Sequence, residues 1–301
     1  IDADIKGFFA NISHEWLLEN IPMDKTILRK FLKAGFIYHN EWHPTQKGTP
    51  QGGIISPTIA NMVLDGLEKV LQARYWRRTP TGKIDQKKNK FKITLVRYAD
   101  DFIITCNDRE KCDEILAVVS EFLAERGVAL SEEKTQIRHI DEGFDFLGFN
   151  IRRYFRQGRK KLIIKPAKES IKRFLGKVRR EIHKHNGASQ TNLILKLNPM
   201  IRGWGNYYQY CNAKVTFGTC DHRIWEALWS WAKRRHKKKG KRWLKARYWH
   251  YWGSRQWTFM VREGNQATAK IVYLGDYKIK HWTMFKIRLN AFEHQGEIRD
   301  A

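Results

Sequence analysis

The sequence predicts an α+β fold in its first half, followed by a mainly α-helical second half. Apolar, β-branched runs at residues 92–98 and 102–105 flank a short acidic turn, which predicts a hairpin of antiparallel strands. From about residue 166 the apolar residues recur at helical spacing among many charged residues. The chain has 301 residues and is therefore long enough for two domains.

The starts of several elements can be predicted in the first half. Residues 1–12 predict a strand that ends in a turn, and Ser13 is the expected N-cap of a short helix. Residues 47–57, KGTPQGGIISP, are rich in glycine and proline and predict a loop. A helix should then begin, with Ser56 as its N-cap and Pro57 at its first position.

Further elements are expected after the acidic turn. A helix with one apolar face should end at Gly127, and residues 129–140 and 144–153 predict further strands. Pro166 and Pro199 predict helix boundaries in the second half. The segment 221–240 then predicts a long helix whose buried face carries tryptophans.

Charge separates the two halves of the chain. Residues 1–150 contain 21 Lys and Arg against 22 Asp and Glu, whereas residues 151–301 contain 36 against 9. The first half thus has a net charge of −1 and the second half one of +27, and such a field attracts polyanions, of which nucleic acid is the commonest. A basic patch for membrane headgroups is the alternative, although no apolar run is long enough to span a bilayer.

Cysteine usage argues against a zinc ribbon or zinc finger. Cys106, Cys112, Cys211 and Cys220 form no C-x-x-C pair. No secretory signal pattern opens the sequence, so we expect reduced thiols. These features predict a protein of the bacterial cytoplasm or an organellar interior, associated with nucleic acid.

Three carboxylates form the candidate active site. Asp100 and Asp101 are adjacent at the tip of the predicted hairpin, and taken alone such a tip is more often simply solvated. Asp4 lies at the end of a predicted neighbouring strand. Carboxylates on adjacent strands can hold Mg²⁺, which prefers oxygen ligands, and two such ions can promote an in-line displacement at phosphorus. Bound cations would also remove the repulsion between the paired acids.

The order of several motifs resembles one enzyme family. The segments ADIKGFFANI, KGTPQGGIISPTIANMVLDGLE, RYADDFII, GVALSEEKTQI and FDFLGFNI resemble the palm motifs of group II intron-encoded reverse transcriptases, which also act as maturases. IRGWGNYYQY resembles the thumb, or maturase X domain, of that family. The resemblance implies a right-hand polymerase palm, an antiparallel sheet with packed helices, followed by a mainly α-helical thumb.

The resemblance also implies a domain organisation. Residues 1–160 would form the palm, without the fingers that precede it in the family, so we expect missing material upstream. Residues 161–260 would form the helical thumb or maturase X domain. Residues 261–301 would be a C-terminal segment, a remnant of a DNA-binding region.

By this resemblance, Asp4, Asp100 and Asp101 are the catalytic residues. Together with the carbonyl of Ile5 they would hold two Mg²⁺ ions as cofactors. The implied reaction is transfer of a nucleotide to a primer, with pyrophosphate as the leaving group.

Four further residues would contact the nucleotide or the template. Phe9, five residues after Asp4, matches the position that blocks a ribose 2′-hydroxyl, although either Phe8 or Phe9 should be plain core. Gln51 and Gly52 would contact the nucleotide or templating base; by themselves they would read as an ordinary turn. Lys134 would lie near the triphosphate and could give a proton to pyrophosphate, and the alternative is a surface lysine.

Primer and RNA contacts are expected in the remaining motifs. Leu147 and Gly148 belong to the block that resembles a primer grip, which also reads as a buried strand. The aromatic and basic segments 201–210 and 233–242 predict RNA contact, because rings stack on bases while cations meet phosphates. The alternative is a helical core with a solvated basic face. The predicted RNA-binding residues are Arg202, Trp204, Tyr207, Tyr208, Lys237, Lys238 and Lys239.

The expected function is RNA-directed DNA synthesis combined with a maturase role in intron splicing. The expected partners are structured intron RNA, an RNA template, a DNA primer and dNTPs, with no membrane; protein partners stay open. Two alternatives remain. One is a maturase that binds RNA and no longer polymerises, and the other is a CRISPR-associated reverse transcriptase.

Overall fold

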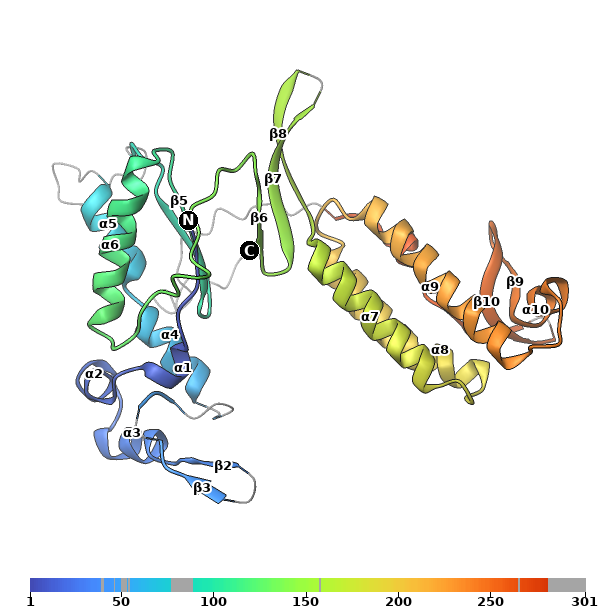
Figure 1. Ribbon diagram of the computed structural model, residues 1–301, viewed down its shortest axis with the longest axis horizontal. Coiled ribbons are helices and arrows are strands. Elements are labelled where there is room, and N and C mark those ends of the chain that lie inside the picture. The colour runs from blue at the N-terminus through green and yellow to red at the C-terminus, as the bar shows by residue number, and fades with distance from the viewer. Residues whose placement is uncertain are drawn as a thin grey trace, which may run out of the picture. The chain divides into compact units, whose positions relative to one another are not determined.

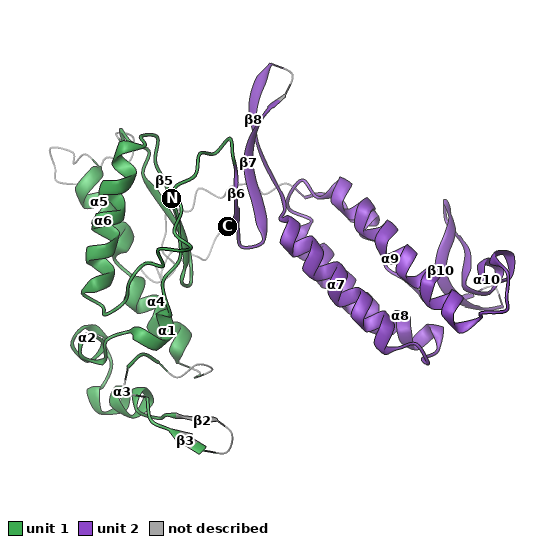
Figure 2. Ribbon diagram, in the orientation of Figure 1, with its two compact units in different colours: residues 1–142 green, residues 143–301 purple. Residues whose placement is uncertain are grey.

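The structure is a computed structural model that describes residues 1–38, 41–45, 47–49, 53, 55–76, 89–156, 158–264 and 266–280. The chain forms two compact units, which comprise residues 1–142 and 143–301 (Figure 2). Each unit has a hydrophobic core made of its own residues. Each therefore buries its apolar side chains within its own helices and strands.

Unit 1, residues 1–142, packs helices against a three-stranded antiparallel sheet (Figure 1). The strand order is β1 (Asp2–Ala3), β5 (Asp101–Thr105), β4 (Thr94–Tyr98). A separate two-stranded ribbon pairs β2 (Phe36–Tyr38) with β3 (Glu41–His43). The helices of the unit are α1 (Phe8–Asn11), α2 (His14–Asn20), α3 (Lys25–Leu32), α4 (Ser56–Leu64), α5 (Leu67–Tyr75) and α6 (Glu110–Ala124).

The core of unit 1 confirms the predicted hairpin and the apolar helix that follows it. Phe102 and Ile104 on β5 are buried, and so are Val119 and Leu123 on α6. Ser13 caps α2 as predicted, because its hydroxyl accepts a hydrogen bond from a backbone N–H in the first turn.

Three local predictions for unit 1 were wrong. Residues 129–140 do not form a strand, because they make only isolated bridges, at Leu130 and Gln136, and turns interrupt the extended backbone. Residues 1–12 do not form one strand, because Gly7 takes a left-handed φ of 54° that ends the extended run and starts α1. Ser56 is the first residue of α4 rather than its N-cap, since Ile55 before it already has helical angles. Pro57 therefore falls one position later than expected.

Unit 2, residues 143–301, combines helices with two antiparallel sheets. One sheet has the order β6 (Phe144–Phe146), β7 (Phe149–Arg156), β8 (Arg159–Pro166). The other has the order β11 (Gln266–Lys270), β10 (Arg255–Glu263), β9 (Trp249–Trp252). The helical elements are α7 (Lys168–Lys184), α8 (Gln190–Tyr208), α9 (Lys214–Arg235), α10 (Lys241–Tyr248) and the short 3-10 turn η2 (Leu274–Asp276).

The second half is thus less purely helical than the sequence predicted, since β9, β10 and β11 follow its last long helix. The boundary predicted at Pro199 was wrong, because this proline lies inside α8. Asn198 holds the helix there: its amide donates to the Lys270 carbonyl (2.9 Å) and accepts from the Val272 N–H (2.8 Å). Burial of Leu197 on the same turn adds packing energy that offsets the cost of an interior proline.

The long helix predicted at 221–240 exists with shifted ends, since α9 spans Lys214–Arg235. Leu228 is buried on its inner face. Trp225 and Trp229 are partly buried, with their rings stacked at 5.5 Å against the core of the unit. No helix in the described ranges is long and apolar enough to cross a membrane.

Candidate functional site

The acidic turn between β4 and β5 is tight and strained. The strands pair up to Tyr98 opposite Asp101, so Ala99 and Asp100 form a two-residue turn. Ala99 has a φ of 54°, in the left-handed region that costs a residue with a Cβ about 1–2 kcal/mol. The guanidinium of Arg97 donates to the Ala99 carbonyl at 3.2 Å and helps to hold this conformation.

Strand register brings the third carboxylate to the same place. In the antiparallel pairing of β1 with β5, Ala3 lies opposite Phe102. Continuing that register by one residue sets Asp4 opposite Asp101. Asp4, Asp100 and Asp101 therefore gather at one end of the sheet, although about one hundred residues separate the first from the other two.

The pKa of Asp101 is affected by this gathering of carboxylates. Desolvation by the surrounding protein raises the pKa of Asp101 above its ordinary 3.8, and the carboxylates of Asp100 and Asp4 raise it further. The Lys134 ammonium opposes the rise. The carboxylates are therefore close enough to repel one another, and a cation among them would be stabilised.

Lys134 lies beside this cluster. Its Nζ donates to Asp4 Oδ2 at 2.8 Å, and the hydrogen bond and charge of Asp4 raise the pKa of Lys134. The Lys134 side chain is 70% exposed and that of Asp4 is 27% exposed, so the pair opens to solvent. The lysine predicted to serve the triphosphate thus contacts a predicted metal ligand.

The backbone around Ile5 leaves its carbonyl available to the same end of the sheet. Ser131 N–H donates to the Asp4 carbonyl (2.8 Å) and Lys6 N–H donates to the Ala129 carbonyl (2.9 Å). These two bonds flank Ile5 and lie on the side of residues 129–131. The Ile5 carbonyl therefore points away from that segment, toward the side on which β5 pairs with β1.

As the chain stands, the described ranges contain no group of three or more His, Cys, Asp or Glu arranged to hold a metal ion. The Lys134 ammonium holds one oxygen of Asp4, so an entering cation has to displace it. The donor set of Asp4, Asp100, Asp101 and the Ile5 carbonyl consists only of oxygen, the ligand type that Mg²⁺ prefers. These residues therefore fit Mg²⁺.

Phe8 and Phe9 differ in burial. Both lie on α1, where Phe8 is buried in the core and Phe9 is partly buried against it. The Phe9 carbonyl accepts a hydrogen bond from Thr49 N–H at 2.6 Å, and a Cβ on Gly48 would overlap the same carbonyl. The glycine-rich loop is thereby fixed to α1 just before the PQGG segment. Gln51 and Gly52 lie outside the described residues.

Within unit 2, two predicted groups form one cluster. Leu147 and Gly148 make the two-residue turn between β6 and β7, with φ values of 48° and 80°. The Tyr207 hydroxyl donates to the Leu147 carbonyl (2.8 Å), and the Tyr208 hydroxyl donates to the Gly148 carbonyl (3.1 Å). Phe149 stacks on Tyr207 with ring centroids 5.1 Å apart. The predicted primer grip is therefore held by the motif that was predicted to bind RNA.

The remaining predicted RNA-binding residues differ in exposure. Tyr208 is 4% exposed and Trp204 stacks on Phe174 at 4.6 Å, so these two rings belong to the core of unit 2. Tyr207 is 49% exposed and Arg202 is exposed. Lys237, Lys238 and Lys239 are exposed in the turn that follows α9.

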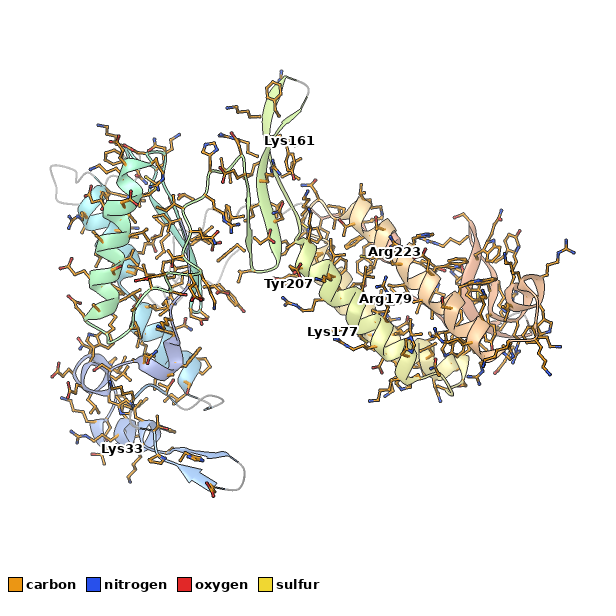
Figure 3. The ribbon with its side chains drawn as sticks, in the orientation of Figure 1. Lys33, Lys161, Lys177, Arg179, Tyr207 and Arg223 are labelled. Atoms are coloured by element: carbon orange, nitrogen blue, oxygen red, sulfur yellow. The ribbon has the colours of Figure 1, made fainter. Side chains whose placement is uncertain are left out.

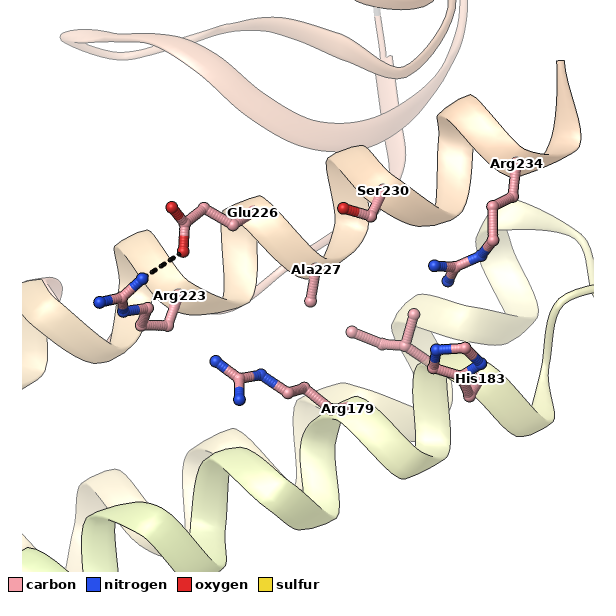
Figure 4. A pocket seen from close by; sticks show the side chains of 8 residues that line it. Arg179, His183, Arg223, Glu226, Ala227, Ser230 and Arg234 are labelled. Carbon is pink, nitrogen blue, oxygen red and sulfur yellow. Dashed lines mark hydrogen bonds and ion pairs between the residues drawn. The ribbon is translucent and has the colours of Figure 1, made fainter. Parts of the chain in front are cut away.

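The sequence reasoning missed a basic groove between α7 and α9. A cavity of about 280 Å³ lies between these helices, and its lining includes three arginines and one carboxylate (Figure 4). Arg179 and Arg223 face it from opposite helices (Figures 3 and 4). The polar residues that line it are Arg179 and His183 on α7, and Arg223, Glu226, Ser230 and Arg234 on α9.

Charge in this groove is only partly neutralised. Arg223 donates to Glu226 at 3.0 Å, and this bond lowers the Glu226 pKa. Among the residues that the structure describes, no carboxylate lies within ion-pair distance of Arg179, His183 or Arg234. A signal existed in the sequence, since residues 223, 226, 230 and 234 follow the spacing of one helix face. It was hidden by the overall basic composition.

Comparisons with known proteins agree with these features. Residues 1–151 match the family model described as reverse transcriptase (RNA-dependent DNA polymerase). Residues 171–249 match the model described as group II intron, maturase-specific domain. The chain therefore belongs to the group II intron-encoded reverse transcriptase family, which confirms the resemblance found in the motifs.

Individual relatives are similar at modest identity. The group II intron-encoded protein LtrA of Lactococcus lactis subsp. cremoris is 29% identical over 288 residues, covering 69% of this chain and 48% of LtrA. The putative COX1/OXI3 intron 2 protein of Saccharomyces cerevisiae is 28% identical over 200 residues, covering 50% and 23%. Protein YkfC of Escherichia coli K12 is 27% identical over 205 residues, covering 58% and 52%. The matches span about half the length of LtrA and of YkfC, and about a quarter of the yeast protein.

Proposed function

We propose that this protein is an RNA-directed DNA polymerase of the group II intron type, with residues 1–160 as the palm and residues 161–260 as the helical thumb. The observation that carries the proposal is the pairing of β1 with β5, because its register, continued by one residue, sets Asp4 opposite Asp101 beside the acidic turn. The family match at residues 1–151 supports the same reaction class.

In this proposal Asp4, Asp100, Asp101 and the Ile5 carbonyl would hold two Mg²⁺ ions. Bound there, Mg²⁺ would supply activation of the primer 3′-hydroxyl and stabilisation of the leaving pyrophosphate. The protein contributes mainly position and charge, as is usual for transfer at phosphorus. The strained turn at Ala99 fixes the two adjacent carboxylates before substrate arrives.

Lys134 and Phe9 would act on the incoming nucleotide. Lysine is ordinarily a cation at neutral pH, so Lys134 could hold a proton for pyrophosphate if it were released from Asp4. The half-buried ring of Phe9 would exclude a ribose 2′-hydroxyl and favour dNTPs. Gln51 and Gly52 are proposed nucleotide or template contacts on sequence grounds.

The turn at Leu147 and Gly148 would grip the primer. The hydroxyls of Tyr207 and Tyr208 hold both of its carbonyls, so the turn presents a rigid backbone to the strand. Rigidity of this kind suits a group that positions a reacting end.

Primer extension tests the polymerase proposal. The purified protein should extend a DNA primer on an RNA template with dNTPs and Mg²⁺, and Asp100→Asn should slow extension by about 100-fold or more. Asp113→Asn on α6 is the matched control, an exposed aspartate paired with Arg109, and should extend normally. Wild-type protein that binds RNA in a salt-sensitive manner without extending the primer would contradict the claim that this chain by itself is an active polymerase. It would leave either a maturase that no longer polymerises or a palm and thumb that need the fingers.

We also propose that unit 2 binds structured intron RNA, in keeping with the maturase-specific match at residues 171–249. Arg202, Tyr207 and residues 237–239 would contribute exposed contacts, and the groove between α7 and α9 would take phosphates. The same match favours an intron role over that of a CRISPR-associated reverse transcriptase.

The groove can be tested against a neighbouring arginine. The double variant Arg179→Gln, Arg234→Gln should bind intron RNA more weakly and lower the slope of log affinity against log salt by about 2, since each phosphate contact contributes about 1. Arg180 lies on α7 next to Arg179 and does not line the groove. The variant Arg180→Gln should therefore leave the slope unchanged. Equal effects of both changes would mean that the groove is no specific contact.

A further inference from the structure

The sheet of β9, β10 and β11 carries a second hollow, outside the residues matched to either family. A cavity of about 270 Å³ lies on it, whereas the maturase-specific match ends at residue 249. Its lining includes aromatic side chains, two cations and one carboxylate. The side chains used below are Trp252, Arg255, Lys270, Tyr273 and Asp276.

Trp252 presents an open ring at the edge of this hollow. It is the last residue of β9 and pairs with Arg255 across the turn that joins β9 to β10. The ring is 45% exposed, and the Lys270 Nζ lies 3.9 Å from its centroid. The cation covers part of the ring, and the exposed remainder can accept a flat partner.

A second part of the lining is held rigid by its own contacts. The Arg255 guanidinium lies 4.2 Å from the centroid of the Tyr273 ring and forms an ion pair with Asp276. The Tyr273 hydroxyl donates to the Trp257 carbonyl at 3.0 Å. A wall fixed by these contacts loses little freedom when a ligand binds.

The combination fits a nucleobase better than other ligands of a basic surface. The volume is below the range of about 300–1,000 Å³ that encloses a drug-sized ligand, so it suits a single planar ring system. Lys270 and Arg255 lie beside the exposed ring, where they could meet the phosphates that flank a stacked base. A lipid headgroup offers no planar ring to stack on Trp252, whereas a base does.

We propose that this hollow binds one unpaired base of single-stranded nucleic acid, stacked on Trp252, with Lys270 and Arg255 contacting adjacent phosphates. Stacking needs no particular base, and both RNA and DNA strands offer the same chemistry. The site does not rest on the proposed polymerase reaction, because it is in unit 2 and needs no metal ion.

Photocrosslinking locates the site directly. The probes are a 12-nucleotide oligo(A) with one central 4-thiouridine and its DNA counterpart with 4-thiothymidine, each added to the full chain with excess duplex RNA to occupy duplex-binding surfaces. We expect a crosslinked peptide that contains Trp252 or Tyr273, and the stronger of the two probes identifies the natural strand. Crosslinks confined to other peptides would overturn the proposal.

Variants supply the matching affinity test under the same competitor. Trp252→Ala should weaken binding of the single strand about tenfold or more, and Trp252→Phe should restore most of it because a ring remains. Trp243→Ala is the matched control, since that ring is 39% exposed, carries Lys239 at 5.5 Å and lies outside the hollow. The proposal fails if Trp252→Ala binds within twofold of wild type, or if Trp252→Phe loses as much affinity as the alanine variant.

Discussion

Asp101 illustrates at the scale of one residue how a proposed catalytic group opposes stability. Its pKa is raised in the folded protein by desolvation and by Asp100 and Asp4. A carboxyl with a raised folded pKa binds its proton more tightly in the folded state. Stability therefore falls as pH rises from the unfolded value of 3.8 through the raised folded pKa.

We predict that Asp101→Asn makes the folded protein slightly more stable at pH 7 while it abolishes primer extension. The melting temperature should rise by about 1–2 °C, a small gain because solvent screens an exposed carboxylate. The gain should vanish below pH 3.8, where aspartate is neutral in both states. Thermal unfolding at several pH values checks this, with Asp113→Asn as control; a lower melting temperature at pH 7 would show that the carboxylate is stabilised by its neighbours.

The residues of the candidate active site were largely predictable, because chemistry restricts them to a few types. Adjacent acids between two strand-like runs, with a third acid at a strand end, already indicated a cation site. The contact between Lys134 and Asp4 was not predictable in that detail. This contact depends on the pairing of Asp2 with Gln136, a long-range bridge that cannot be predicted from a local sequence pattern.

At the scale of elements, the turn between β6 and β7 depends on a glycine. Gly148 has a φ of 80°, and a Cβ there would lie 2.7 Å from the Tyr208 hydroxyl and 2.9 Å from the Ser170 hydroxyl. Tyr208 is buried and has little room to move. The turn therefore excludes a side chain for two separate reasons, backbone strain and overlap.

We predict that Gly148→Ala lowers the free energy of unfolding of unit 2 more than Gly158→Ala does. Gly158 has a similar φ of 74°, and a Cβ there would meet no other atom. The loss of unfolding free energy in Gly158→Ala therefore measures backbone strain alone, about 1–2 kcal/mol. Overlap at Gly148 should add about 1–3 kcal/mol. Urea unfolding of both variants measures the difference, and equal losses would mean that Tyr208 can move aside.

Elements with strong local patterns were the ones that the sequence predicted well. The apolar, β-branched runs of β4 and β5 and the apolar face of α6 were clear before the structure. Pro199 misled the prediction because tertiary bonds to Asn198 keep α8 intact around it. The strands β9 and β10 were missed because their tryptophans resemble a continuation of the helical, aromatic pattern.

At the scale of the molecule, the two units differ in charge and in structure. The compact units divide between residues 142 and 143, close to the point where the sequence becomes basic. The charge was visible in the composition, whereas the grooves that use it were not. The cavity between α7 and α9 and the hollow at Trp252 both require side chains from separate elements to converge.

The central claim is that sequence-distant segments of unit 1 surround one divalent-cation site. Iron-mediated cleavage tests it directly: Fe²⁺ replaces Mg²⁺ in the protein bound to primer, RNA template and the next dNTP, and ascorbate with peroxide then generates hydroxyl radicals at the metal. Cuts should cluster near residues 4–5, 99–102 and 131–135, and should disappear in Asp4→Asn, Asp101→Asn protein. Cuts that avoid these segments, or that persist in the double variant, would contradict the assignment of the metal site.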